Sequence, residues 1–412
     1  MKAYERLIKY ASYPTASCED SETCPSTPEQ LVFAKALADE LRSLGIACVD
    51  LDKNGYLFAE LPATEGCENA PAIGFIAHMD VSPEAPCHDV KTSVVKYQGG
   101  DITLNAEKGI VMREKDFPVL SGYHGKTLVV TDGTTLLGAD DKAGVAEIIT
   151  AAERMINEKT PHGKIMLGFT PDEEIGRGAD LFDVERFGAK YAYTVDGGSF
   201  GEVDFETFNA DSLSVEITGK GIHPGDAKHK MINASAVAIE YDNLLPSLER
   251  PQYTEGYEGF YHMTKMTGEV EKAHLSYILR DHDQAKLAVR RDYAERAARE
   301  LNRKYGEGTV KVTIKESYRN MREMIEPEFH LIENAGKAIR EVSAAHGKPV
   351  EPVSSPVRGG TDGSRLSFMG LPCPNLGTGS HCHHGRMEFA CVEEMDECAD
   401  LIIRIAEIYA GK

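Results

Sequence analysis

Histidine and carboxylate residues stand at the ends of several apolar stretches of the sequence. From the first half of the chain these are His78, Asp80, Asp140, Asp141, Asp172, Glu173, Glu174 and Asp196. Imidazole and carboxylate groups together suit Zn²⁺, Co²⁺ or Mn²⁺, whereas an all-oxygen set favours Mg²⁺ or Ca²⁺. Taken singly, each acid has an ordinary structural explanation, such as serving as the N-cap of a helix. Because clustered carboxylates repel unless a cation neutralises them, their convergence would predict a metal site.

A histidine from the distant C-terminal part would complete such a site. The stretch Gly379–Gly385 offers His381, His383 and His384. A carboxylate such as Asp140, in a tight turn, can bridge two metals about 3.5–4 Å apart. Two Zn²⁺ ions with three carboxylates leave one positive charge, which a hydroxide neutralises. That balance favours ionisation of a water near neutral pH.

The elements that must position these residues alternate between strand and helix. Continuous apolar runs at 72–77, 165–169 and 191–195 are typical of buried strands in a mostly parallel sheet. Amphipathic patterns predict helices over 28–44 and 143–158. The predicted class is α/β. Because ligands bind at the carboxyl ends of parallel strands, the acids that follow these runs would meet at one rim.

A different pattern begins after about residue 208. Strands are predicted over 211–219, 259–268, 273–280 and 309–315, and helices over 233–245 and 283–305. This β-α-β-β-α-β order is typical of a ferredoxin-like α+β domain. The sequence therefore predicts a catalytic domain formed by 1–208 and 318–412, with an inserted domain at 209–317.

The composition excludes several classes of protein. The chain has 45 Lys and Arg residues against 66 Asp and Glu residues, a formal charge of −21. The charge therefore argues against nucleic acid and anionic membranes as partners, because both bind clustered positive charge. No apolar segment reaches the roughly 20 residues that span a bilayer. Nine scattered cysteines favour a reducing compartment, and so a cytoplasmic protein.

Seven short strings in order carry a resemblance to a known family. They are Gly74–Asp80, Leu137–Gly144, Phe169–Gly176, Thr194–Gly198, Gly221–Gly225, Arg358–Gly363 and His384–Phe389. With these strings the chain resembles the M20 metallopeptidases over nearly its whole length, and most closely the bacterial tripeptide aminopeptidases. The resemblance implies a zinc-peptidase catalytic domain with a mixed, mostly parallel sheet, and a ferredoxin-like lid domain inserted in it.

The resemblance also implies a role for each motif residue. His78 and Asp196 would hold one zinc, Glu174 and His384 the other, and Asp140 would bridge the two ions of each subunit. Asp80 would orient His78. Glu173 would be the general base that takes a proton from the metal-activated water and returns it to the leaving amine. Co²⁺ or Mn²⁺ would be substitutes for zinc, and Asp140 and Asp141 would be joined by a cis peptide bond.

A second group of residues would bind substrate. His223 resembles a histidine of the family that stabilises the oxyanion, although a turn residue before a proline is the ordinary reading. Arg280 resembles an anchor for the substrate carboxylate, with a surface salt bridge to Asp281 or Asp283 as its alternative. Arg358 and Asn233 are weaker candidates.

The implied function is a dizinc aminopeptidase that releases the N-terminal residue of tripeptides. The first alternative is a related M20 dipeptidase, carboxypeptidase or N-acyl amino acid deacylase, with the same chemistry and another pocket. A second is a non-catalytic metal-binding protein, against which Glu173 argues, because a structural site needs no base. A nucleotide-dependent oxidoreductase is disfavoured, since no Gly-x-Gly-x-x-Gly string follows the early strands. Small peptides would be the partners, and the sequence leaves monomer and homodimer open.

Overall fold

The computed structural model describes residues 1–412. The chain forms two compact units. The first contains Met1–Phe205, Met321–Ser355 and Thr361–Lys412, and the second contains Glu206–Asn320 and Pro356–Gly360. Residues 356–360, expected in the 318–412 segment, thus pack with the second unit.

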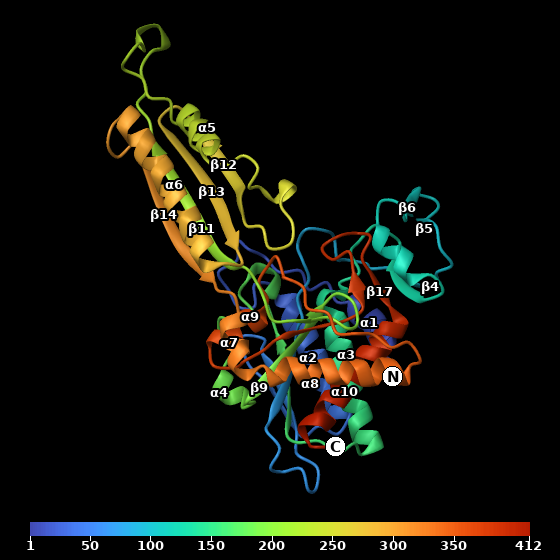
Figure 1. Ribbon diagram of the computed structural model, residues 1–412. Coiled ribbons are helices and arrows are strands. Elements are labelled where there is room, and N and C mark those ends of the chain that lie inside the picture. Colours follow the sequence, from blue (N-terminus) through green and yellow to red (C-terminus); the bar gives the residue numbers. More distant parts are fainter. The chain divides into compact units, whose positions relative to one another are not determined.

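The first unit is built on a seven-stranded sheet (Figure 1). In spatial order its strands are β1 (Cys48–Leu51), β2 (Leu57–Leu61), β8 (Ile165–Thr170), β3 (Ile73–His78), β9 (Tyr191–Gly197), β15 (Asn375–Gly377) and β10 (Val203–Asp204). The central strands from β8 to β15 are parallel, whereas the outer strands pair antiparallel. Every residue of β3 and β8 is buried, which explains why these strands are continuous apolar runs. The predicted mixed α/β architecture is confirmed.

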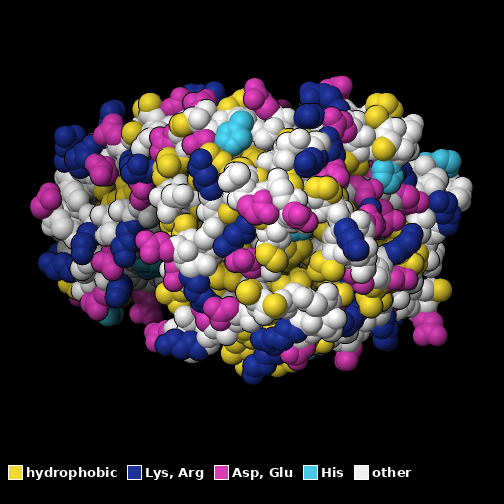
Figure 2. Space-filling model, turned by 90° about the horizontal axis from the view of Figure 1, so that it is seen from below, with side chains coloured by type: hydrophobic (Ala, Val, Ile, Leu, Met, Phe, Trp, Pro, Cys, Tyr) yellow, Lys and Arg dark blue, Asp and Glu magenta, His cyan; other side chains and the backbone are white.

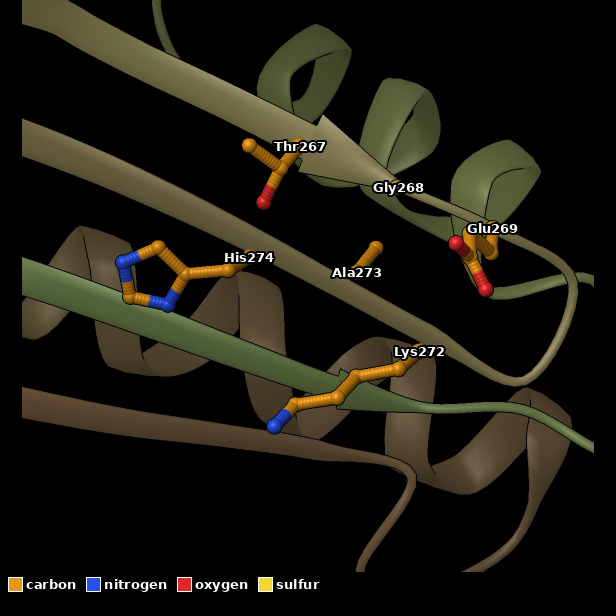
Figure 3. A pocket seen from close by; sticks show the side chains of 6 residues that line it. All are labelled: Thr267, Gly268, Glu269, Lys272, Ala273 and His274. Carbon is orange, nitrogen blue, oxygen red and sulfur yellow. The ribbon is translucent and has the colours of Figure 1, made fainter.

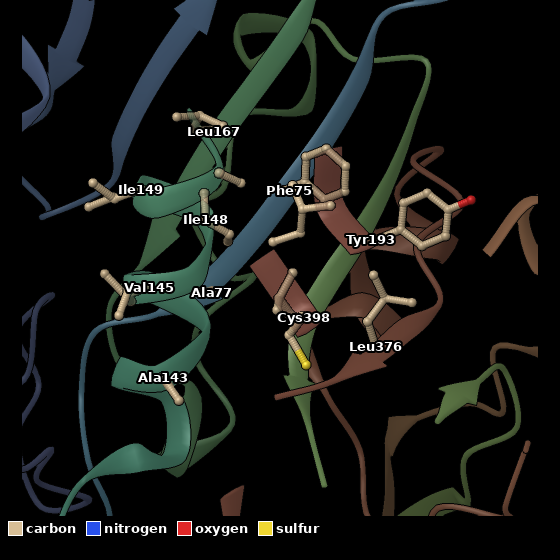
Figure 4. Close-up of a cluster of buried hydrophobic side chains, with 14 of the residues drawn as sticks. Phe75, Ala77, Ala143, Val145, Ile148, Ile149, Leu167, Tyr193, Leu376 and Cys398 are labelled. Carbon is tan, nitrogen blue, oxygen red and sulfur yellow. The ribbon is translucent and has the colours of Figure 1, made fainter. Parts of the chain in front are cut away.

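Helices cover both faces of this sheet. On one face lie α1 (Ala3–Ala11), α2 (Pro28–Ser43), α3 (Ala139–Glu158), α8 (His330–Ala345) and α10 (Val392–Tyr409), which share one apolar core with the strands. Figure 4 labels Val145 and Ile148 of α3 and Phe75 of β3 among the side chains of this core. The other face packs against α4 (Val184–Phe187) and α9 (Asp362–Phe368) in a second apolar cluster that includes Phe187, Leu366 and Ile76. Short helices α7 (Arg322–Ile325), η2 (Glu173–Ile175) and η5 (Glu326–Glu328) complete this unit.

A smaller sheet of the first unit was not predicted from the sequence. Its strands, in spatial order, are β16 (Ser380–His381), β17 (Phe389–Cys391), β7 (Thr127–Thr131) and β4 (Thr92–Lys96). The hairpin of β5 (Ile102–Asn105) and β6 (Ile110–Met112) and the short helix η1 (Pro118–Tyr123) lie between β4 and β7 in the chain. Because β17 pairs with β7, the C-terminal stretch that contains His384 is attached to a much earlier part of the chain.

The second unit has the β-α-β-β-α-β order that the sequence predicts. Its antiparallel sheet has the spatial order β12 (Phe260–Gly268), β13 (Lys272–Asp281), β11 (Asn209–Thr218) and β14 (Val310–Tyr318). The helices are α5 (Ala234–Leu244), α6 (Gln284–Tyr305), η3 (Pro224–Asp226) and η4 (Pro251–Tyr253). Alternate residues of β13 are buried, as expected for a sheet with helices on one face.

The surface mixes charges of both signs. Figure 2 shows one face of the molecule, on which Lys and Arg side chains are interspersed with Asp and Glu. Phosphate backbones bind continuous positive surfaces, which this face does not offer. None of the helices combines the length and the apolar character that crossing a bilayer requires.

Candidate metal centre

Carboxylate and imidazole groups from four segments converge beside the carboxyl end of β3. His78 is the last residue of β3, and its Nε2 lies 3.0 Å from Asp140 Oδ1 and 3.6 Å from Asp196 Oδ1. His78, Asp140 and Glu174 form one group whose ligand atoms lie within 4.8 Å of one another, and His78, Asp141 and Asp196 form another. The rim predicted from the sequence therefore brings these side chains together.

The histidines of the 379–385 loop occupy three different environments. His384 Nε2 lies 2.8 Å from Glu174 Oε2 and 3.4 Å from Asp140 Oδ2. His383 Nδ1 lies 3.6 Å from Asp140 Oδ2, while its Nε2 hydrogen-bonds to the Ser380 hydroxyl. His381 instead hydrogen-bonds to the Tyr123 hydroxyl. Of the three, His384 contacts two candidate carboxylates.

Asp80 connects His78 to the loop of the two glutamates. The Asp80 carboxylate accepts hydrogen bonds from the backbone N–H groups of Glu173 (3.0 Å) and Glu174 (3.1 Å). His78 Nδ1 lies 3.4 Å from Asp80 Oδ1, and its closest acceptor is the Asp80 carbonyl oxygen at 3.0 Å. Asp80 thus contacts His78 through both its side chain and its backbone.

Glu173 and Glu174 are neighbours with different surroundings. Glu174 Oε2 lies beside His384, while its Oε1 is buried and has no hydrogen-bond partner. The carboxylate of Glu173 makes no hydrogen bond or ion pair, and burial raises its pKa well above the usual value. The short helix η2 directs the two adjacent side chains to different places. Glu174 could therefore offer its carboxylate to a metal ion, whereas the Glu173 carboxylate could hold or accept a proton.

The sequence of the chain matches a known protein family. The sequence model of Peptidase family M20/M25/M40 matches residues 130–408, which is more than half of the chain. The chain belongs to this family. Peptidase T of Caldanaerobacter subterraneus subsp. tengcongensis is 50% identical over 413 residues, covering 100% of this chain and 99% of that protein. The similarity to this relative extends over the whole length of the chain.

Solved structures share the M20 fold of this chain. Aminopeptidase PepT from Bacillus cereus has a TM-score of 0.75 at 24% identity, covering 100% of this chain and 98% of that chain. A dinuclear metal-binding peptidase of the M20 family from Bacillus subtilis has a TM-score of 0.64 at 14% identity, covering 98% and 97%. Both structures therefore have the same overall fold as this chain.

The charges of the cluster shift one another's pKa values. Burial alone would raise the pKa of Asp140, but hydrogen bonds with His384 and His78 hold it well below its usual range. Burial opposes a charge on His78, but the carboxylates of Asp196 and Asp140 raise its pKa well above its usual value. Hydrogen bonds to Asp140 and Glu174 raise the pKa of His384 to about 11. The carboxylates thus demand positive charge between them, which divalent cations supply.

Two buried acids hold the Asp140 turn: Asp141, for which the family resemblance implied a cis peptide bond, and Glu388, to which the sequence assigned no role. Glu388 accepts hydrogen bonds from the backbone N–H groups of Leu137, Gly138 and Asp140, at 2.7–2.9 Å. Asp141 accepts hydrogen bonds from the N–H groups of His78 (3.1 Å) and Gly144 (3.2 Å), and it joins Asp140 by a cis peptide bond. Glu388 lies in the His384–Phe389 string, so this motif was the signal for its importance.

Gly144 of α3 packs against the backbone of β9. A Cβ atom there would lie 1.9 Å from the Val195 carbonyl oxygen and 2.5 Å from Asp141 Oδ1. We expect Gly144→Ala to lower the free energy of unfolding by about 3 kcal/mol, because overpacking forces backbone to move. Urea denaturation measures this change. Gly122→Ala, whose Cβ would meet nothing within 4 Å, should change it by less than about 0.5 kcal/mol. Equal losses in both variants would contradict the expectation.

In the second unit, Arg280 is not paired with a carboxylate. Its Nη1 donates to the carbonyl oxygens of Leu279 (3.1 Å) and Asp211 (3.5 Å), and the guanidinium lies 5.1 Å from the centroid of the Tyr318 ring. The alternative of a salt bridge to Asp281 or Asp283 is wrong, because Asp281 pairs with Arg290 and Asp283 caps α6.

The other candidates of the second unit have structural contacts. His223 is exposed, and its Nδ1 accepts a hydrogen bond from the Gly225 N–H. Asn233 caps α5 by accepting from the Ala236 N–H at 3.2 Å. His223 therefore makes the contact of an ordinary turn residue, and Asn233 makes that of an ordinary helix N-cap.

Arg358 makes several hydrogen bonds within the second unit. Its guanidinium donates to the carbonyl oxygens of Gly256 and Glu258 and to the Thr254 hydroxyl, each at 2.8 Å. It also lies 5.2 Å from the centroid of the Phe208 ring. Arg358 thus has fewer donors left for a substrate than Arg280.

An open pocket of about 340 Å³ lies at the turn between β12 and β13 (Figure 3). Its lining residues are Thr267, Gly268, Glu269, Lys272, Ala273 and His274. None of the candidate substrate-binding residues is among them, so this pocket is separate from the predicted binding residues.

Proposed function

We propose that this protein is a metal-dependent aminopeptidase that releases the N-terminal residue of tripeptides. The observation that carries the proposal is the convergence of His78, Asp196, Glu174 and His384 around Asp140. Support for the substrate class comes from relatives named Peptidase T, which are about half identical to this chain over its whole length. The proposed partners are small peptides.

Two Zn²⁺ ions per subunit are the proposed cofactors, with Co²⁺ or Mn²⁺ as substitutes. His78 and Asp196 would hold one ion, Glu174 and His384 the other, and Asp140 both. The donor set fits this group, because it combines imidazole with carboxylate and because the buried Glu174 Oε1 has no partner in the protein. When bound, such ions lower the pKa of water and polarise a carbonyl oxygen.

The residues around the ligands would supply the proton transfers. Glu173 would take the proton from the attacking water and return it to the nitrogen of the leaving dipeptide, as one peptide bond is replaced by an amine and a carboxylate. Its carboxylate makes no hydrogen bond or ion pair within the protein, and burial raises its pKa, which suits a group that must accept a proton. Asp80 would keep His78 and the Glu173–Glu174 backbone in place.

Residues 209–317 are proposed as the inserted domain that binds substrate, between the catalytic segments 1–208 and 318–412. Arg280 would hold the carboxylate of the peptide, because its guanidinium has no acidic partner in the chain. His223 would stabilise the oxyanion, and Asn233 and Arg358 would contribute weaker contacts. A cytoplasmic location is proposed as well, because all nine cysteines are free thiols.

A competition assay tests the function directly. The zinc-loaded protein is given equal amounts of a tripeptide, the dipeptide that lacks its last residue, and the N-acetylated tripeptide. We expect release of the first residue from the tripeptide, at least about tenfold faster than cleavage of either competitor, and loss of that release after chelation. Faster cleavage of the dipeptide or of the acetylated peptide would favour a related M20 dipeptidase or deacylase. Release that persists without metal would overturn the metal centre.

A further inference from the structure

A third acid precedes the two glutamates, and the proposed function does not use it. Asp172 lies two residues after Thr170, the last residue of β8, and directly before Glu173. It is fully buried and has a φ of 58°, in the left-handed region that few residues other than glycine adopt. Such a conformation persists only where the surroundings fix it. The contacts of Asp172 therefore determine where the chain enters η2.

Two residues near the start of α2 bind Asp172. Its carboxylate accepts hydrogen bonds from the Ser26 N–H (2.7 Å), the Ser26 hydroxyl (2.5 Å) and Gln30 Nε2 (2.7 Å). The backbone N–H of Asp172 donates in turn to Gln30 Oε1 at 3.1 Å. Gln30, which is also fully buried, thus contacts both the side chain and the backbone of Asp172.

The same part of the chain contacts a second loop of the centre. The Ser17 N–H donates to the Val81 carbonyl oxygen, and the Thr15 hydroxyl donates to that of Met79. Further along, Arg177 donates to the carbonyl oxygen of Ser21 at 2.6 Å. The segment 15–30 is thus bound both to the loop that follows His78 and to the loop that contains Glu173 and Glu174.

We propose that Asp172 is a positioning residue for Glu173, acting through Ser26 and Gln30. This inference rests on the proposed function, because it takes Glu173 as the general base. Asp172 holds the backbone on one side of Glu173, and Asp80 holds the N–H groups of Glu173 and Glu174 on the other. A base must keep its place closely, since a misplacement of about 1 Å can cost on the order of 100-fold in rate.

Asp172→Asn tests the proposal with a minimal change of shape. The amide has one acceptor oxygen, so its NH₂ group faces a donor of Ser26 or Gln30 and the loop must shift. We expect kcat per metal-loaded molecule to fall about 30-fold on a tripeptide, with KM unchanged within twofold and zinc content at saturation unchanged. Gln30→Ala should lower kcat about tenfold. The double variant should be no worse than Asp172→Asn alone, because both act through one contact.

Asp183→Asn is the matched control. Asp183 is exposed and caps α4, so this variant should retain wild-type kcat. A merely structural role of Asp172 would lower the melting temperature and the folded fraction while kcat per metal-loaded molecule stayed the same, and that result would overturn the proposal. Additive losses in the double variant would overturn it as well. If Asp172→Asn does not fold, Gln30→Ala is tested in its place. Its melting temperature and its kcat per metal-loaded molecule then distinguish a positioning role from a structural one. Wild-type protein that does not cleave tripeptides would instead refute the proposed function.

Discussion

Replacing Glu173 with Gln is expected to lower turnover of a tripeptide by about 10²–10⁴-fold, the usual contribution of a general base. Glutamine keeps the shape of the side chain but cannot accept the proton. The carboxylate of Glu173 makes no hydrogen bond or ion pair within the protein, so its replacement breaks no contact there. Metal content should therefore stay at the wild-type level. Steady-state kinetics and elemental analysis of the same preparation measure the two quantities.

Glu185→Gln is a matched control for this variant, because Glu185 is exposed on the short helix α4. It should retain both metal and turnover. If Glu173→Gln kept wild-type turnover, Glu173 would lose its role as the base. If it lost its metal, Glu173 would belong to the ligand set.

His78→Ala is expected to remove bound metal and to reduce turnover by at least about 10³-fold. The imidazole of His78 belongs to both groups of ligand-type atoms, so its loss weakens the whole cluster. The carboxylate of Asp196 then loses the imidazole that it contacts, and Asp140 keeps only the histidines of the 379–385 loop. Metals contribute several kcal/mol to hydrolysis, and each 1.36 kcal/mol is about tenfold in rate. Elemental analysis after gel filtration gives the metal content, and tripeptide hydrolysis gives the rate.

The control for this second variant is His88→Ala, since His88 is exposed and lies ten residues further along the chain. It should bind metal and cleave tripeptides like the wild type. Full metal content in His78→Ala would exclude His78 as a ligand, whatever its turnover.

Much of the first unit could be predicted because its central strands are buried on both faces. The apolar runs at 72–77, 165–169 and 191–195 correspond to β3, β8 and β9 within one or two residues. Since side chains after parallel strands meet at one rim, the convergence of His78 with Asp196 followed from local patterns alone. Helix α2 begins at Pro28, as the proline predicts.

The smaller sheet could not be predicted, because its pairs join distant parts of the chain. Phe389 pairs with Val130, more than 250 residues earlier, and the two C-terminal strands β16 and β17 have only two and three residues. Such short strands have no clear periodicity. The hydrogen bonds between Glu388 and the Asp140 turn depend on the same long-range pairing, so no local pattern could assign them.

The choice among the C-terminal histidines also needed the structure. From the residues alone, His381, His383 and His384 were equivalent candidates, and only the family string favoured His384. The structure separates them by their partners, which are Tyr123 for His381, Ser380 for His383, and Glu174 for His384.

The order of the candidate ligands along the chain has a consequence for how the protein is made. His78, Asp140, Glu174 and Asp196 precede the second unit, whereas His384 follows it. During translation the four early side chains therefore leave the ribosome well before the fifth. With the proposed ligand set, a nascent chain would lack the complete metal site, and therefore peptidase activity, until the second unit and the segment after it have been synthesised.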